Sequence, residues 1–370
     1  EELGVKIRRI FHFVLVAVFV GVSACASAEL EAPDQLIEYS RGQRTDLRVE
    51  VPAGESDGPQ TFIPLSIISG SSPGPTVLMV AGVHGYEFSP ILAAQRLADE
   101  VDPAELSGTL IIVRVAHISA YENRSPYVNP YDRKNLNRSF PGDPNGTQTE
   151  RIAWALSSRI IPEADFVLDV HSGDGAEWLE AFVGVYGGPL STSFETAFEF
   201  AEATGFPNIV RYQMNTQEQV DTGRSLNRQA VAQGLPTILV EIGENGSRKA
   251  EHVEAIVSGV RRGLVGLDML SDAMEPTPEP THYFDGTQSV PVGHSGVWTP
   301  VSSEGQFVES DEILGHIHDY KGELVETVRS PLSGYTLYGL AGPPIRAGDS
   351  AATIARQSTR SELAAGTSDN

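Results

Sequence analysis

The sequence is poor in cysteine and in positive charge. Its single cysteine is Cys25, so the chain can form no intrachain disulfide. Lysine and arginine total 26 against 49 aspartate and glutamate residues, which gives a formal net charge of -23. Nucleic acids and polyanionic surfaces are bound by cationic patches, so this balance argues against both as partners. The remaining composition, 40% hydrophobic and 20% charged in 370 residues, is that of an ordinary soluble protein with room for two domains.

Residues 1–28 have the pattern of a targeting signal. Three basic residues precede an apolar stretch, 10–22, that is too short to cross a bilayer comfortably. Two cleavage sites compete. VSAC, ending at Cys25, resembles a bacterial lipobox and would leave a lipid-anchored Cys25, whereas ASA at 26–28 would direct ordinary signal cleavage. Both predict an exported protein, in the bacterial periplasm or anchored to the membrane, and both exclude 1–28 from the fold.

Residues 29–270 are predicted to form an α/β domain. Apolar runs typical of buried strands alternate with segments of helical periodicity. The strands are predicted at 76–81, 109–115, 166–170 and 237–242, and the helices at 89–101, 149–161, 193–204, 225–233 and 249–270. Near-continuous Val, Ile and Leu strands between helices indicate a parallel or mixed sheet covered by helices. The segment 29–73 adds one or two leading strands, one of them DLRVEV.

The composition changes after residue 270. Residues 271–286 include three prolines between 276 and 280, which no helix interior tolerates, and are predicted to be a linker. Residues 287–356 hold short alternating apolar runs broken by Gly and Pro, which predicts a small all-β domain. Residues 357–370 contain no apolar run and are predicted to be a flexible tail.

Polar residues with the chemistry of a metal site follow two of the predicted strands. His84 and Glu87 come directly after the strand 76–81, and His171 follows 166–170. Ligands of open α/β sheets bind beyond the carboxyl ends of the strands, where these three side chains would meet. A zinc hydrolase needs three protein ligands and one open position for water. A single histidine at a strand end is more often a structural residue, but two histidines and a glutamate together favour a zinc site.

Two further segments carry residues suited to catalysis and substrate binding. Glu241 lies in an otherwise apolar strand, where an uncompensated carboxylate would be costly, so it is either a structural ion-pair member or a catalytic base. Asn137 and Arg138 lie side by side in NLNRSFPG. An arginine guanidinium binds a carboxylate in a bidentate fork, and the neighbouring amide can add a hydrogen bond. Arg138 on its own could equally form a surface salt bridge.

Four segments in this order resemble the succinylglutamate desuccinylase/aspartoacylase family, a branch of the zinc carboxypeptidase superfamily: GVHGYE, NLNRSFPG, DVHSG and VEIG. The resemblance covers about 74–270 and implies a zinc carboxypeptidase-like mixed sheet flanked by helices. It implies one zinc ion per chain, held by His84, Glu87 and His171. It also implies that Glu241 is the general base and acid.

The same resemblance implies further substrate contacts. Asn137 and Arg138 would hold the α-carboxylate of the substrate. The family uses another arginine to stabilise the developing oxyanion, for which Arg124 is the candidate and Arg133 the rival. The closing β domain resembles the barrel-sandwich domain of lipoyl and biotinyl carriers, but its turn PLSGYTLYG has no lysine, so no lipoyl or biotin attachment is expected.

Three functions are consistent with these residues. The first is a zinc-dependent deacylase that hydrolyses the amide bond of an N-acyl amino acid. The second is an exported metallocarboxypeptidase acting on short peptides or cell-wall fragments with a free carboxylate, which would use the same side chains. The third, a non-enzymatic binding protein, is disfavoured because no ligand and no catalytic residue is missing. A deacylase should have a cleft closed by loops or by the β domain, and a peptidase an open one.

Overall fold

The computed structural model describes residues 40–365, apart from 55–57, 222–223 and 272–276. The predicted signal segment 1–28 and Cys25 lie outside the described residues, so export and lipidation stay predictions. None of the described helices combines the length and the apolar character needed to cross a membrane.

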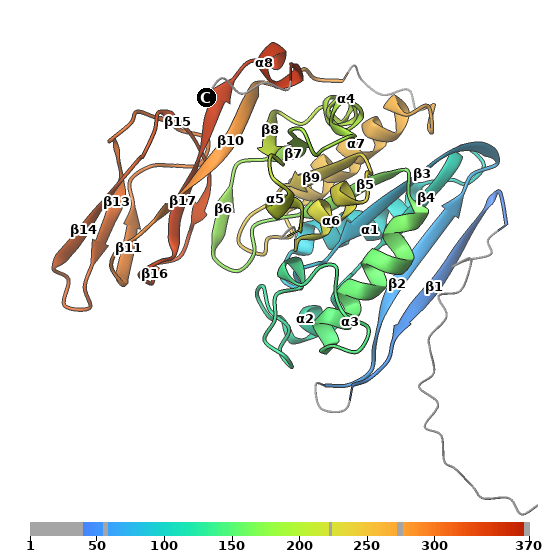
Figure 1. The fold of residues 1–370 in the computed structure, drawn as a ribbon, viewed down its shortest axis with the longest axis horizontal. Coiled ribbons are helices and arrows are strands. Elements are labelled where there is room, and N and C mark those ends of the chain that lie inside the picture. The colour runs from blue at the N-terminus through green and yellow to red at the C-terminus, as the bar shows by residue number, and fades with distance from the viewer. Residues whose placement is uncertain (1–39, 55–57, 222–223, 272–276, 366–370) are drawn as a thin grey trace, which may run out of the picture. The chain divides into compact units, whose positions relative to one another are not determined.

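A long mixed sheet organises the described chain (Figure 1). Its N-terminal part has the strand order β1-β2-β4-β3-β5-β9-β7-β8. The strands β3, β4, β5 and β9 are mutually parallel, whereas β2 is antiparallel to β4 and β7 is antiparallel to β9. Their bounds are β1 Gln43–Val51, β2 Thr61–Ser69, β3 Ser72–Ala81, β4 Ser107–Val113, β5 Phe166–His171, β7 Phe182–Gly187, β8 Asn208–Gln213 and β9 Thr237–Glu241.

Helices cover both faces of this part of the sheet. The main helices are α1 Phe88–Glu100, α3 Gln148–Ala155, α4 Phe194–Thr204, α6 Leu226–Ala232 and α7 Ala250–Gly266, and the shorter ones are α2 Ile118–Asn123 and α5 Gln217–Asp221. Successive residues of β3 alternate between two cores. Val77 and Met79 pack with α1, α4 and α7, whereas Leu78 and Val80 pack with α3 and α6. This two-sided burial explains why the central strands are apolar at nearly every position.

The C-terminal strands form two antiparallel groups. A four-stranded sheet has the order β14-β13-β11-β16, and a second group, β10-β17-β15-β12, continues the main sheet from β8. Trp298, Leu314 and Ile317 belong to a separate buried core in this region. The bounds are β10 His282–Pro291, β11 Gly296–Pro300, β12 Phe307–Val308, β13 Ile313–His318, β14 Leu324–Arg329, β15 Gly334–Leu340, β16 Pro344–Ile345 and β17 Ser350–Ser358.

Two boundaries differ from those expected. The linker expected at 271–286 is shorter, because its last residues belong to a strand. This strand, β10, begins at His282 and pairs in parallel with β8 from Asn208 onward. The expected tail 357–370 is ordered through residue 365, because β17 extends to Ser358 and a short helix, α8 Arg360–Ala364, follows. A capping box between Thr359 and Glu362 starts this helix and is visible in the sequence TRSE.

A short strand joins the two regions next to the carboxyl ends of the parallel strands. This strand, β6 Glu177–Leu179, pairs antiparallel with β15, and Leu179 lies opposite Tyr338. The pairing places a tyrosine of the C-terminal region beside the edge of the sheet where His171 and Glu241 end their strands.

Candidate active site

The candidate catalytic residues meet at the carboxyl ends of three neighbouring strands. His84 and Glu87 lie in the connection between β3 and α1, where Glu87 is the N-cap residue of the helix. His171 is the last residue of β5 and Glu241 the last of β9, and the two pair in parallel register. The connection approaches α2 so closely at Gly85 that a β-carbon there would collide with the backbone nitrogen of Tyr121. Glycine is therefore required within the GVHGYE motif.

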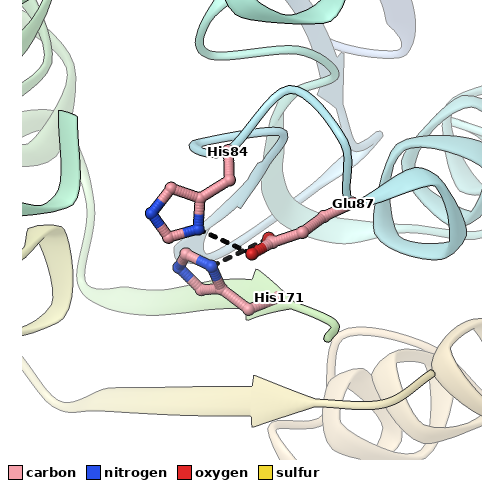
Figure 2. A group of neighbouring side chains, drawn as sticks. All are labelled: His84, Glu87 and His171. Carbon is pink, nitrogen blue, oxygen red and sulfur yellow. Dashed lines mark hydrogen bonds and ion pairs between the residues drawn. The ribbon is translucent and has the colours of Figure 1, made fainter. Parts of the chain in front are cut away.

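His84, Glu87 and His171 form a buried cluster (Figure 2). The Nδ1 atom of His84 lies 2.6 Å from Oε1 of Glu87, and Nδ1 of His171 lies 2.9 Å from Oε2. One donor atom from each residue lies within 4.8 Å of the other two. Two imidazoles and one carboxylate in this arrangement suit zinc, because they are typical zinc donors and leave a coordination position open.

The ring nitrogen of His171 that faces away from Glu87 has a carboxylate partner. This atom, Nε2, lies 2.9 Å from Oδ1 of Asp169, and Oδ2 of Asp169 accepts a hydrogen bond of 2.9 Å from the side-chain amide of Asn227. All three residues are buried. A carboxylate on the far nitrogen of an imidazole fixes its tautomer and orientation, so Asp169 and Asn227 point the Nδ1 atom of His171 at Glu87.

Charges within the cluster shift the pKa values of its members. Burial acts to lower the pKa of His171, but the carboxylates of Asp169 and Glu87 outweigh it and raise that pKa well above the usual range. Burial acts to raise the pKa of Glu87, but the two imidazoles outweigh it and lower the value to about 2. Burial raises the pKa of Glu241 well above that of an ordinary carboxyl. A carboxyl with a raised pKa is suited to accept a proton near neutral pH.

A cavity of about 190 Å³ opens at the cluster. It brings together six of the seven site residues expected from the sequence: His84, Glu87, Asn137, Arg138, His171 and Glu241. Asn137 is buried, and its Oδ1 atom accepts a hydrogen bond of 3.0 Å from the backbone nitrogen of Leu226. Arg138 is exposed and ends a short 3₁₀ turn, so its guanidinium is accessible to a ligand.

Arg124 and its rival Arg133 are not among the residues that line this cavity. Both are exposed, and both have left-handed backbone conformations, with φ of 51° and 61°. Tyr127, from the loop between them, does line the cavity, and its ring meets the ring of His84 edge-on at 5.8 Å. Burial and the nearby carboxylates of Glu177 and Asp174 raise the pKa of Tyr127, so its phenol stays protonated.

A second chamber of about 360 Å³ adjoins the first and shares Asn137, Arg138, Phe182, Glu241 and Tyr338 with it. It adds Arg224 and Arg228, at the start of α6, and two stacked tyrosines, Tyr186 and Tyr212, 5.6 Å apart.

These additional lining residues were not predicted from the sequence. Arg224 and Arg228 flank or lie within a segment expected only as a helix, and their sole signal is the recurrence of arginine in RSLNR. Tyr338 comes from the C-terminal region and had no signal at all.

Known proteins related to this chain indicate its family. The family model for the succinylglutamate desuccinylase/aspartoacylase catalytic domain matches residues 73–267. The N-alpha-acetyl-L-2,4-diaminobutyric acid deacetylase of Halomonas elongata is 27% identical over 277 residues, which are 74% of this chain and 79% of that protein.

Solved structures show the same fold. A succinylglutamate desuccinylase/aspartoacylase from Rhodobacter sphaeroides superposes with a TM-score of 0.77 at 23% identity, over 87% of this chain and 98% of that chain. The ectoine utilization protein EutE from Ruegeria pomeroyi, in a product-bound structure, gives 0.77 at 24% identity, over 86% and 97%. The predicted fold class, a mixed sheet flanked by helices and followed by antiparallel strands, is confirmed. The chain belongs to the succinylglutamate desuccinylase/aspartoacylase family.

Proposed function

We propose that this protein is a zinc-dependent hydrolase that cleaves the amide bond of a small N-acyl amino acid. The observation that carries the proposal is the buried His84, Glu87 and His171 cluster at the floor of a cavity that also contains Glu241 and Arg138. Zinc held by the three ligands would supply a Lewis acid and lower the pKa of a bound water to about 7.

Glu241 is the proposed general base. Its position beside His171 at the end of the neighbouring strand places its carboxyl on the cavity wall. As the new C–O bond forms, this carboxylate takes the proton of the attacking water. It then gives the proton to the amide nitrogen as the C–N bond breaks and the free amine leaves.

Arg138 and Asn137 are the proposed anchors of the α-carboxylate. The exposed guanidinium of Arg138 offers the bidentate fork, and the hydrogen bond from Leu226 fixes the amide of Asn137. We assign the stabilisation of the carbonyl oxygen to the phenol of Tyr127 rather than to Arg124, because Tyr127 lies in the cavity beside His84 and Arg124 does not. The phenol is hydrogen-bonded to Glu177 in this structure and would exchange that partner for the substrate.

The wall of the catalytic cavity supports deacylation rather than peptide cleavage. Leu179 of β6 and Tyr338 of β15 both line it, so the C-terminal region forms part of its wall. This wall leaves room for a small substrate. A peptide chain could enter only if the wall moved away. The second chamber has room for an amino-acid side chain, about 360 Å³.

The charge of the second chamber favours an anionic side chain on the substrate. Three arginines line it, Arg138, Arg224 and Arg228, and the one carboxyl among its lining residues is Glu241. In a chain with almost twice as many acidic as basic residues, this excess of guanidinium groups over carboxyl groups favours the binding of anions. We therefore propose an N-acyl dicarboxylic amino acid, in contrast to the diaminobutyric acid in the name of the Halomonas relative.

The test combines zinc content with release of free amine. Purified protein should contain one zinc per chain and should release amine fastest from N-acetyl aspartate or glutamate, compared with N-acetyl leucine and N-acetyl-2,4-diaminobutyrate. A preference for the diaminobutyrate substrate would refute the assignment of an anionic side chain. Zinc-loaded protein that releases no amine from any member of an N-acyl panel would refute the deacylase function.

A further inference from the structure

A separate cavity, of about 200 Å³, lies outside the catalytic cavity and its adjoining chamber. Its walls come from β8, β10, β15 and the residues after β6, together with the turn before β12. The lining residues include three rings, two carboxylates and one amide: His282, Phe284, Tyr335, Glu180, Glu304 and Asn208. None of these six residues lines either catalytic chamber.

The rings form a continuous aromatic wall. The centroids of His282 and Tyr335 are 4.6 Å apart, those of His282 and Phe284 are 5.8 Å apart, and those of Phe284 and Tyr335 are 5.5 Å apart. The Nδ1 atom of His282 lies 3.1 Å from the side-chain oxygen of Asn208, which fixes the imidazole in this wall. Aromatic faces carry negative electrostatic potential and attract cations within about 6 Å.

Two carboxylates lie next to this wall. Glu304 directly precedes Gly305, and a β-carbon at Gly305 would lie 2.9 Å from Oε2 of Glu180, so both carboxylates flank the same turn. Within the described part of the chain neither forms an ion pair, and the carboxylate of Glu180 accepts a hydrogen bond of 3.5 Å from the side-chain amide of Asn208. No lysine or arginine is among the residues that line the cavity.

We propose that this cavity is a binding site for a small organic cation with an alkylammonium group. Aromatic rings and carboxylates together bind such groups by cation–π attraction and by charge, and the cavity volume suits a ligand of a few heavy atoms. A divalent metal ion does not fit the same side chains. Among the described residues, the one group of three clustered metal donors is His84, Glu87 and His171.

The cavity shares a wall with the catalytic site. Leu179, the last residue of β6, lines the catalytic cavity, and the next residue, Glu180, lines the separate cavity. On β15, Tyr338 lines the catalytic cavity and Leu337 lines the separate cavity. A hydrogen bond of 2.8 Å from the nitrogen of Glu180 to the oxygen of Leu337 joins the two strands here. The bound cation would therefore contact the reverse side of the strands that wall the catalytic cavity.

The experiment is calorimetric titration of the full, zinc-loaded chain with choline, using the neutral isostere 3,3-dimethyl-1-butanol as the comparison ligand. We expect saturable binding of choline at one site and binding of the alcohol on the order of tenfold weaker or more, since the alcohol lacks the charge that the rings and carboxylates attract. Equal binding of the two ligands, or no binding of choline at millimolar concentrations, would overturn the proposal.

Variants locate the site. Glu180→Gln and Tyr335→Leu should each weaken choline binding several-fold while leaving zinc content unchanged. Glu304→Gln, in an exposed turn, provides a third variant if Tyr335→Leu does not fold. Glu323→Gln, an exposed carboxylate elsewhere in the C-terminal region, is the matched control and should bind choline as the wild type does. Choline affinity that is unchanged in Glu180→Gln and Glu304→Gln would place the cation elsewhere and contradict the proposal.

Discussion

His171 and Glu241 occupy paired positions at the ends of two neighbouring parallel strands. The strand register alone thus places the proposed base beside a proposed zinc ligand, because in-register residues of adjacent parallel strands point to the same side of the sheet. His84 and Glu87 reach the same point from the end of β3, the strand on the other side of β5. The relative position of His171 and Glu241 therefore depends on strand register, whereas His84 and Glu87 are positioned by the short connection between β3 and α1.

Removing the imidazole of His171 should remove the metal. We expect His171→Ala to be purified with little zinc, because the remaining two ligands cannot hold the ion tightly. Metal analysis of the purified variant is the measurement. His252→Ala is the control, since its imidazole lies outside the catalytic cavity, and it should keep its zinc. Stoichiometric zinc in His171→Ala would exclude this residue as a ligand.

Asn227 should affect zinc affinity without touching the metal. Its amide holds Asp169, which in turn orients His171. Loss of such an outer partner typically lowers metal affinity about 10–100-fold, so Asn227→Ala should show a weaker zinc affinity in chelator competition. Gln229→Ala, two residues further along α6, should not change it. An unaltered affinity in Asn227→Ala would mean that Asp169 orients His171 without help.

Substrate binding at position 138 should depend on the planar shape of the arginine side chain as well as on its charge. Arg138→Lys keeps the charge and loses the planar fork, so we expect a large fall in kcat/KM on substrates with an α-carboxylate and no loss of zinc. Arg133→Lys, in the same loop but outside the cavity, should have wild-type kinetics. Wild-type kinetics in Arg138→Lys would refute carboxylate recognition by this residue.

The buried His117 should make stability depend on pH. Burial lowers its pKa to about 4 in the folded protein. Its unfolded pKa is near 6.5, so between these values the unfolded chain binds more protons and the free energy of unfolding rises with pH. The stabilising contribution is complete above pH ~6.5, is lost toward pH ~4 and amounts to roughly 3 kcal/mol.

The measurement is urea unfolding of metal-free wild type and His117→Phe at several pH values. The variant should have a smaller slope of unfolding free energy against pH in this interval. Equal slopes in the two proteins would show that His117 titrates alike in the folded and unfolded states.

The meeting of the candidate metal ligands and of the proposed anchors in one cavity could be predicted, because each follows an apolar strand or lies in a compact motif. His171 and Glu241 end their strands and His84 follows β3 by three residues, so chain order indicates a shared edge of the sheet. Tyr338 could not be predicted, because it reaches the cavity only through the pairing of β6 with β15, across more than 150 residues. Arg124 was the candidate for the oxyanion contact, with no motif to support it over Arg133, and the residue of this loop that lines the cavity is Tyr127.

The most direct test of the proposed mechanism is the kinetics and zinc content of Glu241→Gln. Glutamine keeps the size of the side chain and one hydrogen-bonding oxygen but cannot accept the proton. General acid–base catalysis contributes about 10²–10⁴-fold, so kcat should fall by at least that order while zinc stays near one per chain. Loss of zinc would make Glu241 a ligand. Turnover that persists near the wild-type rate, with zinc bound, would contradict the proposed mechanism.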